Sequence, residues 1–273
     1  MIALHARRSA PAIHAWAEQQ PGKPLIVVLT GTDLYRDIQT DASAKTSLAL
    51  ATHLVVLQDA GLAVLPAGLR AKATVIYQSA PRLKPTDKSS QRLTAVMVGH
   101  LRDEKDPLTF IKASGLSQVK NVRFEQIGDG LDEALASAAR QAAANNPNFR
   151  WLGGLPRGTT RQRIKRAHVL VNCSVMEGGA HVILEAVQSS TPVLASFISG
   201  NVGMLGTDYA GYFDVGDAAG LTALVDRCAA EPNFLAHLQH QCNQRAKLFE
   251  PALEKHLVLK LVNDGLTPLT HQP

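Results

Sequence analysis

Short apolar runs rich in β-branched residues recur along the chain and alternate with stretches in which apolar residues repeat at helical spacing. Such runs predict buried strands, and the stretches between them predict helices. The expected strands lie at 24–31, 52–58, 73–79, 94–100, 122–128, 149–154, 168–174 and 192–197. The expected helices of the later part lie at 106–116, 131–144, 160–167, 180–190 and 218–230, and two more follow. This alternation predicts an α/β protein with parallel sheets.

One break in the pattern divides the chain. Residues 80–92 are rich in Pro, Lys and Ser and have no apolar period, which is typical of an interdomain linker. We therefore expect an N-terminal Rossmann-like domain at 1–85, a second doubly wound domain at 86–245 and a C-terminal helical segment at 246–273. The opening residues, MIALHARRS, resemble the end of a buried strand without a preceding turn. We therefore expect the first domain to be truncated, lacking an upstream strand–helix–strand portion.

Composition and charge narrow the class of ligand. The net charge of +5 suits an anionic ligand, whereas aromatic residues make up 5% of the chain, too few for a base-stacking nucleic-acid surface. No apolar run reaches the length of a transmembrane helix. The three cysteines, Cys173, Cys228 and Cys242, lack metal-ligand spacing. They predict a reduced, cytoplasmic protein without a metal site.

The segment 176–186 carries the most specific chemistry. It contains two glutamates, Glu177 and Glu185, eight residues apart, and Gly178 and Gly179 follow the first. Glu177 should lie in a loop at the carboxyl edge of the sheet, where open α/β sheets bind ligands, and Glu185 should lie on the following helix. The free N–H groups at the start of that helix would suit a diphosphate. An ordinary capped helix with a surface glutamate would explain the same residues.

Two other loops could bind phosphate. In 98–113, the expected strand ends at Gly99 and is followed by His100, Arg102 and Lys105, although a polar loop with basic residues by chance gives the same pattern. The turn IGDG at 127–130 indicates only that the backbone turns sharply. The second of these loops, 199–217, should be flexible and rich in glycine. It could bind phosphate through backbone N–H groups, or it could be a plain long loop.

These segments stand in a fixed order along the chain: VGHLRDEKDP, IGDG, WLGGLP, EGGAHVILEAVQSSTPVLAS and GYFDVGD. That ordered set resembles the E-x7-E glycosyltransferases, which have the GT-B fold. The resemblance covers 94–217 and, more loosely, 1–80. It implies two Rossmann-like domains with a cleft between them and a nucleotide-sugar donor bound to the second domain. It implies no cofactor.

The resemblance also implies roles for individual residues. Glu177 is expected to act on the donor sugar, together with the backbone of Gly178, Gly179 and Ala180. Glu185 is expected to hold the ribose of the nucleotide.

The diphosphate and the base have their own expected residues. Lys105 matches the lysine that binds the diphosphate in the family. His100 stands where the family has an arginine, so either Arg102 takes that role or diphosphate binding becomes weaker or sensitive to pH. The base-binding stretch maps to Leu155 and the two residues after it.

A narrower resemblance spans almost the whole chain. The segments HARRS, VLTGTDLYRDI, VIYQSA and SGNVGMLGTDYAGYFDVGD resemble the selenosugar synthases of selenoneine biosynthesis. Those enzymes join the selenium of selenophosphate to a sugar taken from a UDP-sugar. The resemblance implies UDP-N-acetylglucosamine as the donor and a small anion, selenophosphate, as the acceptor.

The acceptor is expected to bind after the first two strands, on the side of the cleft. His5 is expected beside the donor sugar as a catalytic residue, although a structural histidine would fit the sequence equally well. Exposure to solvent would equally explain Arg7 and Arg8. We assign the acceptor to basic, hydroxyl and small residues: Arg7, Thr30, Thr32, Asp33, Asn201 and Gly203.

Two other functions stay open at this point. One is an ordinary glycosyltransferase that transfers a hexose to a sugar or lipid acceptor. The other is a truncated, non-catalytic remnant that only binds a nucleotide sugar.

Overall fold

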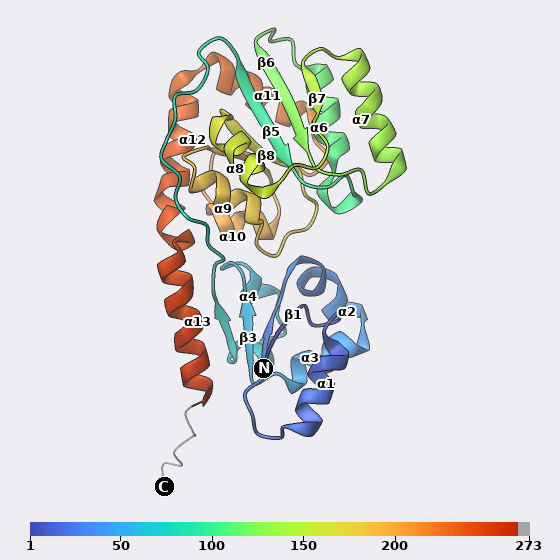
Figure 1. The fold of residues 1–273 in the computed structure, drawn as a ribbon, viewed down its shortest axis with the longest axis vertical. Helices are drawn as coiled ribbons and strands as arrows, with labels where there is room; N and C mark the ends of the chain where they lie inside the picture. Colours follow the sequence, from blue (N-terminus) through green and yellow to red (C-terminus); the bar gives the residue numbers. More distant parts are fainter. Residues whose placement is uncertain (267–273) are drawn as a thin grey trace.

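Two separate parallel sheets organise residues 1–266, the part of the chain that the computed structural model describes. The first sheet has the strand order β1-β2-β3-β4, and the second has the order β10-β9-β8-β5-β6-β7. Figure 1 shows the two domains stacked along the long axis of the molecule, with the first in blue and cyan. The predicted α/β architecture with two Rossmann-like domains is therefore confirmed.

The first domain alternates short strands with helices. In chain order, its elements are β1 (Ile2–Leu4), α1 (Ala10–Gln19), β2 (Ile26–Val28), η1 (Asp33–Asp37), α2 (Ile38–Thr40), α3 (Ala42–Leu50), β3 (His53–Val56), α4 (Gly61–Val64), α5 (Ala67–Arg70) and β4 (Ala73–Val75).

The second domain begins after the linker with β5 (Leu93–Val98). It continues with η2 (Asp103–Lys105), α6 (Pro107–Leu116), β6 (Val122–Ile127), α7 (Glu133–Asn145), β7 (Phe149–Trp151), α8 (Arg157–Arg166), β8 (Val169–Asn172) and α9 (His181–Val187). It ends with β9 (Val193–Ser196), α10 (Ser199–Leu205), β10 (Tyr212–Phe213), α11 (Ala218–Ala230), α12 (Pro232–Arg245) and η3 (Ala246–Phe249), before the long helix α13 (Pro251–Leu266).

Every strand predicted from an apolar run is present, each shorter than its run. The prediction was wrong in the segment 199–217, where α10 and β10 replace the expected flexible loop. Met204 and Leu205 are buried, so this segment gains core contacts as a helix despite its glycines. The helix expected at 180–190 is also shorter, because α9 ends at Val187 and Ser190 adopts a positive φ of 56°.

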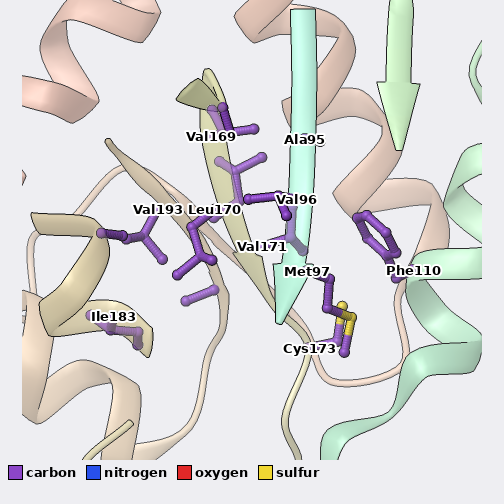
Figure 2. Close-up of a cluster of buried hydrophobic side chains, with 14 of the residues drawn as sticks. Ala95, Val96, Met97, Phe110, Val169, Leu170, Val171, Cys173, Ile183 and Val193 are labelled. Carbon is purple, nitrogen blue, oxygen red and sulfur yellow. The ribbon is translucent and has the colours of Figure 1, made fainter. Parts of the chain in front are cut away.

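The centre of the second sheet is apolar on both faces. All four residues of β8 and all four of β9 are buried, which is the pattern of a parallel sheet covered by helices on both sides. Figure 2 shows side chains of β5 and β8 next to each other, with Phe110 of α6 on one side and Ile183 of α9 on the other. This core fixes the positions of the loops that follow β5 and β8.

The strand order reverses between β5 and β8. From β5 the chain runs outward through β6 and β7, and it then returns to β8 and runs the other way through β9 and β10. The connections after β5 and β8 therefore leave the sheet on opposite faces and open a crevice between them. In open α/β sheets such a reversal is the usual place for a ligand.

Helix α13 belongs to the C-terminal segment but covers the first sheet. Its residues Leu257, Val258, Leu261 and Val262 pack on a cluster that includes Ile26 of β2. The other face of that sheet is covered by α1 and α3. Figure 1 shows α12 beside the second domain and α13, in red, beside the first. The chain thus crosses between the domains twice, once through the linker and once through α13.

The linker lies against the second domain, where it contacts α8 and the turn that follows α9. Leu83 N–H donates to the carbonyl of Gln188 at 2.9 Å, and Arg161 donates to the carbonyl of Pro81 at 2.6 Å. Lys88 Nζ donates to the carbonyl of Ser190 at 3.3 Å. Burial lowers the pKa of Lys88 to about 8. A segment that the composition marks as a linker is therefore held in place by tertiary hydrogen bonds.

The low pKa of Lys88 predicts a pH-dependent contribution to stability. In the unfolded chain a lysine has a pKa of about 10.4, so between about pH 8 and pH 10 the unfolded state binds more protons, and stability rises with pH. Relative to Lys88→Met, the unchanged protein should gain about 1–2 kcal/mol in unfolding free energy from pH 7 to pH 10, after discounting for partial exposure. Denaturant unfolding at several pH values measures this gain.

A matched control is Lys260→Met, since the Lys260 side chain is 62% exposed. That substitution should leave the pH dependence unchanged. A constant difference between the unchanged protein and Lys88→Met from pH 7 to pH 10 would contradict the assignment.

Candidate active site

A pocket of about 420 Å³ opens at the carboxyl ends of β5 and β6, beside the reversal in strand order. We call it the β5–β6 pocket. Four residues that the sequence predicted for the donor line it together, namely His100, Arg102, Lys105 and Leu155. Three of these four are basic side chains from the connection after β5, so the pocket suits an anion.

The connection after β5 is shaped by its own sequence. Asp106 adopts a left-handed φ of 44° and caps α6 by accepting a hydrogen bond from Thr109 N–H at 3.2 Å. Pro107 begins the helix, where no N–H donor is needed. The aliphatic part of the Lys105 side chain packs on Gly99. A Cβ atom at Gly99 would lie 3.3 Å from Cγ of Lys105. These features direct Lys105 toward the connection after β8.

Lys105 and Glu177 form an ion pair across the crevice. The Nζ of Lys105 donates to Oε1 of Glu177, and the hydroxyl of Ser174 donates to the same oxygen at 2.6 Å. The two charged side chains are 18% and 11% exposed, so water screens them little. The pair links the connection after β5 to the connection after β8. Glu177 is thereby held by one oxygen, in a fixed orientation.

His100 is oriented by the connection after β6. Its Nδ1 accepts a hydrogen bond from Asp129 N–H at 3.1 Å, and the Asp129 carboxylate lies 3.5 Å from the same nitrogen. A ring nitrogen that accepts a hydrogen bond carries no proton, so the neutral ring carries its proton on Nε2. A neutral His100 can therefore donate one hydrogen bond from Nε2.

Glu185 is buried beside three basic side chains. The Nε of Arg157 lies 3.4 Å from its Oε1, the Nε of Arg161 lies 3.8 Å away, and Nδ1 of His181 lies 3.4 Å away. Burial by itself would raise the pKa of Glu185, but the hydrogen bond and charge of His181 and the charges of the two arginines lower it overall. Glu185 is therefore ionised at neutral pH, and its carboxylate can accept hydrogen bonds from hydroxyl groups.

A second pocket, of about 250 Å³, lies between the two domains. We call it the cleft pocket. It is lined from the first domain by His5, Thr30 and Thr32, and from the second by Glu177 and Arg102, among others. Gly178 and Gly179 also line it. Arg102 lines both pockets, so the two pockets adjoin at this side chain.

His5 is held in a strained position at this cleft. It has a φ of 72°, which is rare for a residue other than glycine. Its Nε2 lies 2.9 Å from the hydroxyl of Thr32, and its Nδ1 accepts a hydrogen bond from Arg8 N–H at 3.3 Å. The ring therefore donates from Nε2 to Thr32. His5 and Glu177 thus line the same pocket from the two domains.

Gly178 brings the two domains into direct backbone contact. A Cβ atom at Gly178 would lie 2.3 Å from the carbonyl carbon of Thr30, and one at Gly31 would lie 3.0 Å from the nitrogen of Gly178. Only glycine permits such an approach. Ala180 follows Gly179 of the cleft pocket and precedes His181 of the β5–β6 pocket. It is 3% exposed.

Asp33 does not face the acceptor side as predicted. It is fully buried, and its carboxylate accepts hydrogen bonds from Ala6 N–H at 2.9 Å and from the N–H and hydroxyl of Thr30, both at 2.8 Å. These bonds fasten the connection after β1 to the connection after β2. Asp33 therefore positions His5 and Thr30 and has no free surface for a ligand.

The two arginines after β1 lie in different places. Arg7 Nε donates to the carboxylate of Asp37 at 2.8 Å and does not line the cleft pocket. Arg8 lines that pocket. The sequence could not separate these neighbours, because the direction of each side chain depends on Asp37, which lies on η1.

Asn201 and Gly203 also lie away from the cleft pocket. Asn201 is buried in α10, and its Nδ2 donates to the carbonyl of Ser196 at 3.0 Å. A Cβ atom at Gly203 would lie 1.7 Å from Oε1 of Gln58. Neither residue lines the cleft pocket: Asn201 is bonded within the second domain, and α10 packs against Gln58 of the first domain at Gly203.

Sequence reasoning missed His181 and Arg161. His181 lines the β5–β6 pocket, and Arg161 lies beside Glu185. A signal was present, because His181 and Glu185 are four residues apart on one helix, as are Arg157 and Arg161 on another. Within residues 1–266, no group of three or more His, Cys, Asp or Glu side chains could hold a metal ion. No helix in that range is long and apolar enough to cross a membrane.

Residues 82–249, more than half of the chain, match the family model described as "Glycosyl transferases group 1". The chain belongs to this glycosyltransferase family. Its two facing α/β domains are the GT-B arrangement. The family match includes Lys105, Glu177 and Glu185.

Individual relatives agree with this family. A segment of this glycosyltransferase is 31% identical over 116 residues to "Glycosyltransferase 1 domain-containing protein 1" of Xenopus tropicalis, and it spans 34% of that protein's length and 42% of this chain. HepE of Anabaena, solved in complex with UDP and glucose, is similar in structure, with 14% identity and a TM-score of 0.79. The match covers 96% of this chain and 78% of HepE. The pneumococcal O-GlcNAc transferase GtfA, solved with UDP and GlcNAc, is also similar, with 18% identity and a TM-score of 0.74. That match covers 97% of this chain and 57% of GtfA. At such identities the two structures share the fold.

The buried position of Asp33 predicts a structural role in this glycosyltransferase. Asp33→Ala should lower the free energy of unfolding by about 2–4 kcal/mol, because it leaves buried N–H donors without acceptors. Denaturant unfolding measures this change.

Asp264→Ala is the control, because the Asp264 side chain is 57% exposed. It should change stability by less than about 0.5 kcal/mol. If Asp33→Ala leaves stability unchanged and impairs only the use of an acceptor, Asp33 belongs to the acceptor site after all.

Proposed function

We propose that this glycosyltransferase transfers a sugar from a UDP-sugar, with UDP-N-acetylglucosamine as the donor, to selenophosphate. The product is a 1-selenosugar, as in selenoneine biosynthesis. One observation carries the proposal: the cleft pocket, which presents hydroxyl and cationic side chains, adjoins a second cationic pocket through Arg102. We also propose a cytoplasmic location, in line with three buried cysteines that are all free.

The β5–β6 pocket would bind the UDP part of the donor. Lys105, Arg102 and the Nε2–H of His100 would contact the diphosphate, and Leu155 would contact the base. Negative charge grows on the diphosphate as the bond to the sugar breaks. Cations already fixed in place stabilise that charge without rearrangement, which lowers the barrier. Proteins with this fold have been solved with UDP, which supports the choice of donor.

Glu177 would orient the sugar between the two pockets. Lys105 and Ser174 hold its Oε1, and its second oxygen would accept from a sugar hydroxyl. The same lysine would contact the diphosphate, so it would fix the sugar and the leaving group relative to each other. Such positioning of the reacting atoms lowers the entropy cost of the reaction.

The acceptor would bind in the cleft pocket. Arg8, Arg102, Thr30 and Thr32 offer the cations and hydroxyl groups that suit a small phosphate-like anion. Glu104 also lines this pocket, and it lies 3.9 Å from Arg102, which offsets its charge. His5 would complete the wall beside the sugar, with its proton directed to Thr32.

The reaction would need little help from a base. Selenium attacks the anomeric carbon, the selenium–carbon bond forms and the bond from that carbon to the UDP oxygen breaks. The electron pair of the broken bond leaves with UDP. Water then cleaves the phosphorus–selenium bond, which gives the 1-selenosugar and phosphate. Because selenium is already a strong nucleophile, catalysis would rest on positioning and on stabilisation of UDP.

Loss of the Glu185 carboxylate should weaken UDP binding. Glu185→Ala removes a charged acceptor for the ribose hydroxyls and should reduce the affinity for UDP by about 1–3 kcal/mol in calorimetry. Glu133→Ala is the matched control, since the Glu133 side chain is 82% exposed and lies on α7, and it should bind UDP normally. Equal affinities in the two variants would remove Glu185 from the site.

Incubation with selenophosphate and a panel of UDP-sugars tests the whole proposal. Mass spectrometry should detect a selenium-containing sugar, formed fastest from UDP-N-acetylglucosamine. Arg8→Gln should raise the concentration of selenophosphate needed for half-maximal rate about tenfold or more, from the loss of a charged hydrogen bond, while the affinity for UDP stays unchanged.

Each other result points to a different function. Transfer to sugar or lipid acceptors, with none to selenophosphate, would identify an ordinary glycosyltransferase. UDP binding without transfer to any acceptor would identify a non-catalytic binding protein.

A further inference from the structure

His181 is a titratable side chain of the β5–β6 pocket that has no role in the function proposed above. It is the first residue of α9, lines the pocket and is 38% exposed at its side chain. Its Nδ1 lies 3.4 Å from Oε1 of Glu185. His181 thus contacts both the space where a diphosphate would lie and the carboxylate expected to hold the ribose.

The charges around His181 come from four parts of the second domain. They are Glu185 on α9, Arg157 and Arg161 on α8, His100, Arg102 and Lys105 after β5, and Asp129 after β6. Without a ligand, the cations outnumber the anions in this pocket. A bound diphosphate would add negative charge to this pocket and reverse the balance.

We propose that His181 takes up a proton when a nucleoside diphosphate binds, and that the resulting imidazolium bridges the diphosphate and Glu185. This inference rests on the proposed binding of a UDP-sugar in the β5–β6 pocket. The imidazolium would donate from Nδ1 to Glu185 and from Nε2 to a phosphate oxygen. The diphosphate would thereby help to fix the carboxylate that holds the ribose.

The geometry assigns the proton to His181 and not to His100. The Nδ1 of His100 already accepts a hydrogen bond from Asp129 N–H, so a second proton on that ring would break this bond. Its Nε2–H can donate to a phosphate oxygen while the ring stays neutral. Both histidines have a carboxylate near Nδ1, but the one beside His181 belongs to Glu185, which is 6% exposed, whereas the one beside His100 belongs to Asp129, which is 61% exposed. Water screens the exposed pair, so a proton gains more beside Glu185.

The consequence is a pH-dependent affinity. Because the bound state holds one more proton, affinity for a nucleoside diphosphate should fall as the pH rises above the pKa of a free histidine, about 6.5. The useful window lies between about pH 7 and pH 8.5, above the pKa of about 6 that a terminal phosphate itself has.

Calorimetry with UDP at about pH 7.5, in two buffers that differ in ionisation enthalpy, measures the proton uptake directly. The unchanged protein should take up about half a proton or more for each UDP bound, and its affinity should fall about fivefold or more from pH 7 to pH 8.5. His181→Gln should bind UDP more weakly, with no uptake from this site and a flat pH profile. His100→Gln should bind more weakly but keep the uptake.

The outcomes separate this inference from the proposed function. If the unchanged protein does not bind UDP, the proposed donor site is wrong. If UDP binds without proton uptake, or if His181→Gln keeps the uptake, the role of His181 is wrong. Loss of the uptake only in His100→Gln would assign the proton to His100.

A second measurement does not require a folded variant. The imidazole resonances of the unchanged protein can be titrated by NMR with and without UDP. One histidine should titrate at a pH higher by about 1.5 units or more when UDP is present. Absence of any such displacement would overturn the inference.

Discussion

The ion pair between Lys105 and Glu177 is the contact on which the site depends. It joins the connection after β5 to the connection after β8, on the two sides of the point where the strand order reverses. Ser174 holds the same carboxylate oxygen, so neither charged group is left without a partner in a poorly hydrated place. The pair lies between the two pockets, because Lys105 lines the β5–β6 pocket and Glu177 lines the cleft pocket.

The cleft pocket exists only because the two domains approach each other closely. The backbone of Gly178 meets that of Thr30 and Gly31, at a distance that no larger residue allows. Asp33 fixes the first-domain side of this contact through hydrogen bonds to Ala6 and Thr30. Helix α13 and the linker cross between the domains and add further contacts. These contacts bring side chains of both domains to one pocket.

Positive and negative side chains lie in different parts of the second-domain site. Basic side chains gather in the β5–β6 pocket, and the buried carboxylate of Glu185 lies behind two arginines and His181. The pKa of Glu185 is lowered by these neighbours in spite of burial. In the function proposed above, such a site would hold the diphosphate at one end and the ribose hydroxyls at the other.

The sequence by itself determined the strands and placed Lys105 and His100 just after β5, where both line one pocket. Alternation and strand ends are local features, and parallel strands bring their carboxyl ends to one edge of the sheet. It did not determine that 199–205 is a helix, since that outcome depends on burial of Met204 and Leu205 in the second-domain core and on contact of Gly203 with Gln58. Nor could it place Asp33 or His181. Their roles depend on partners that only the tertiary structure brings within hydrogen-bonding distance or into a common pocket.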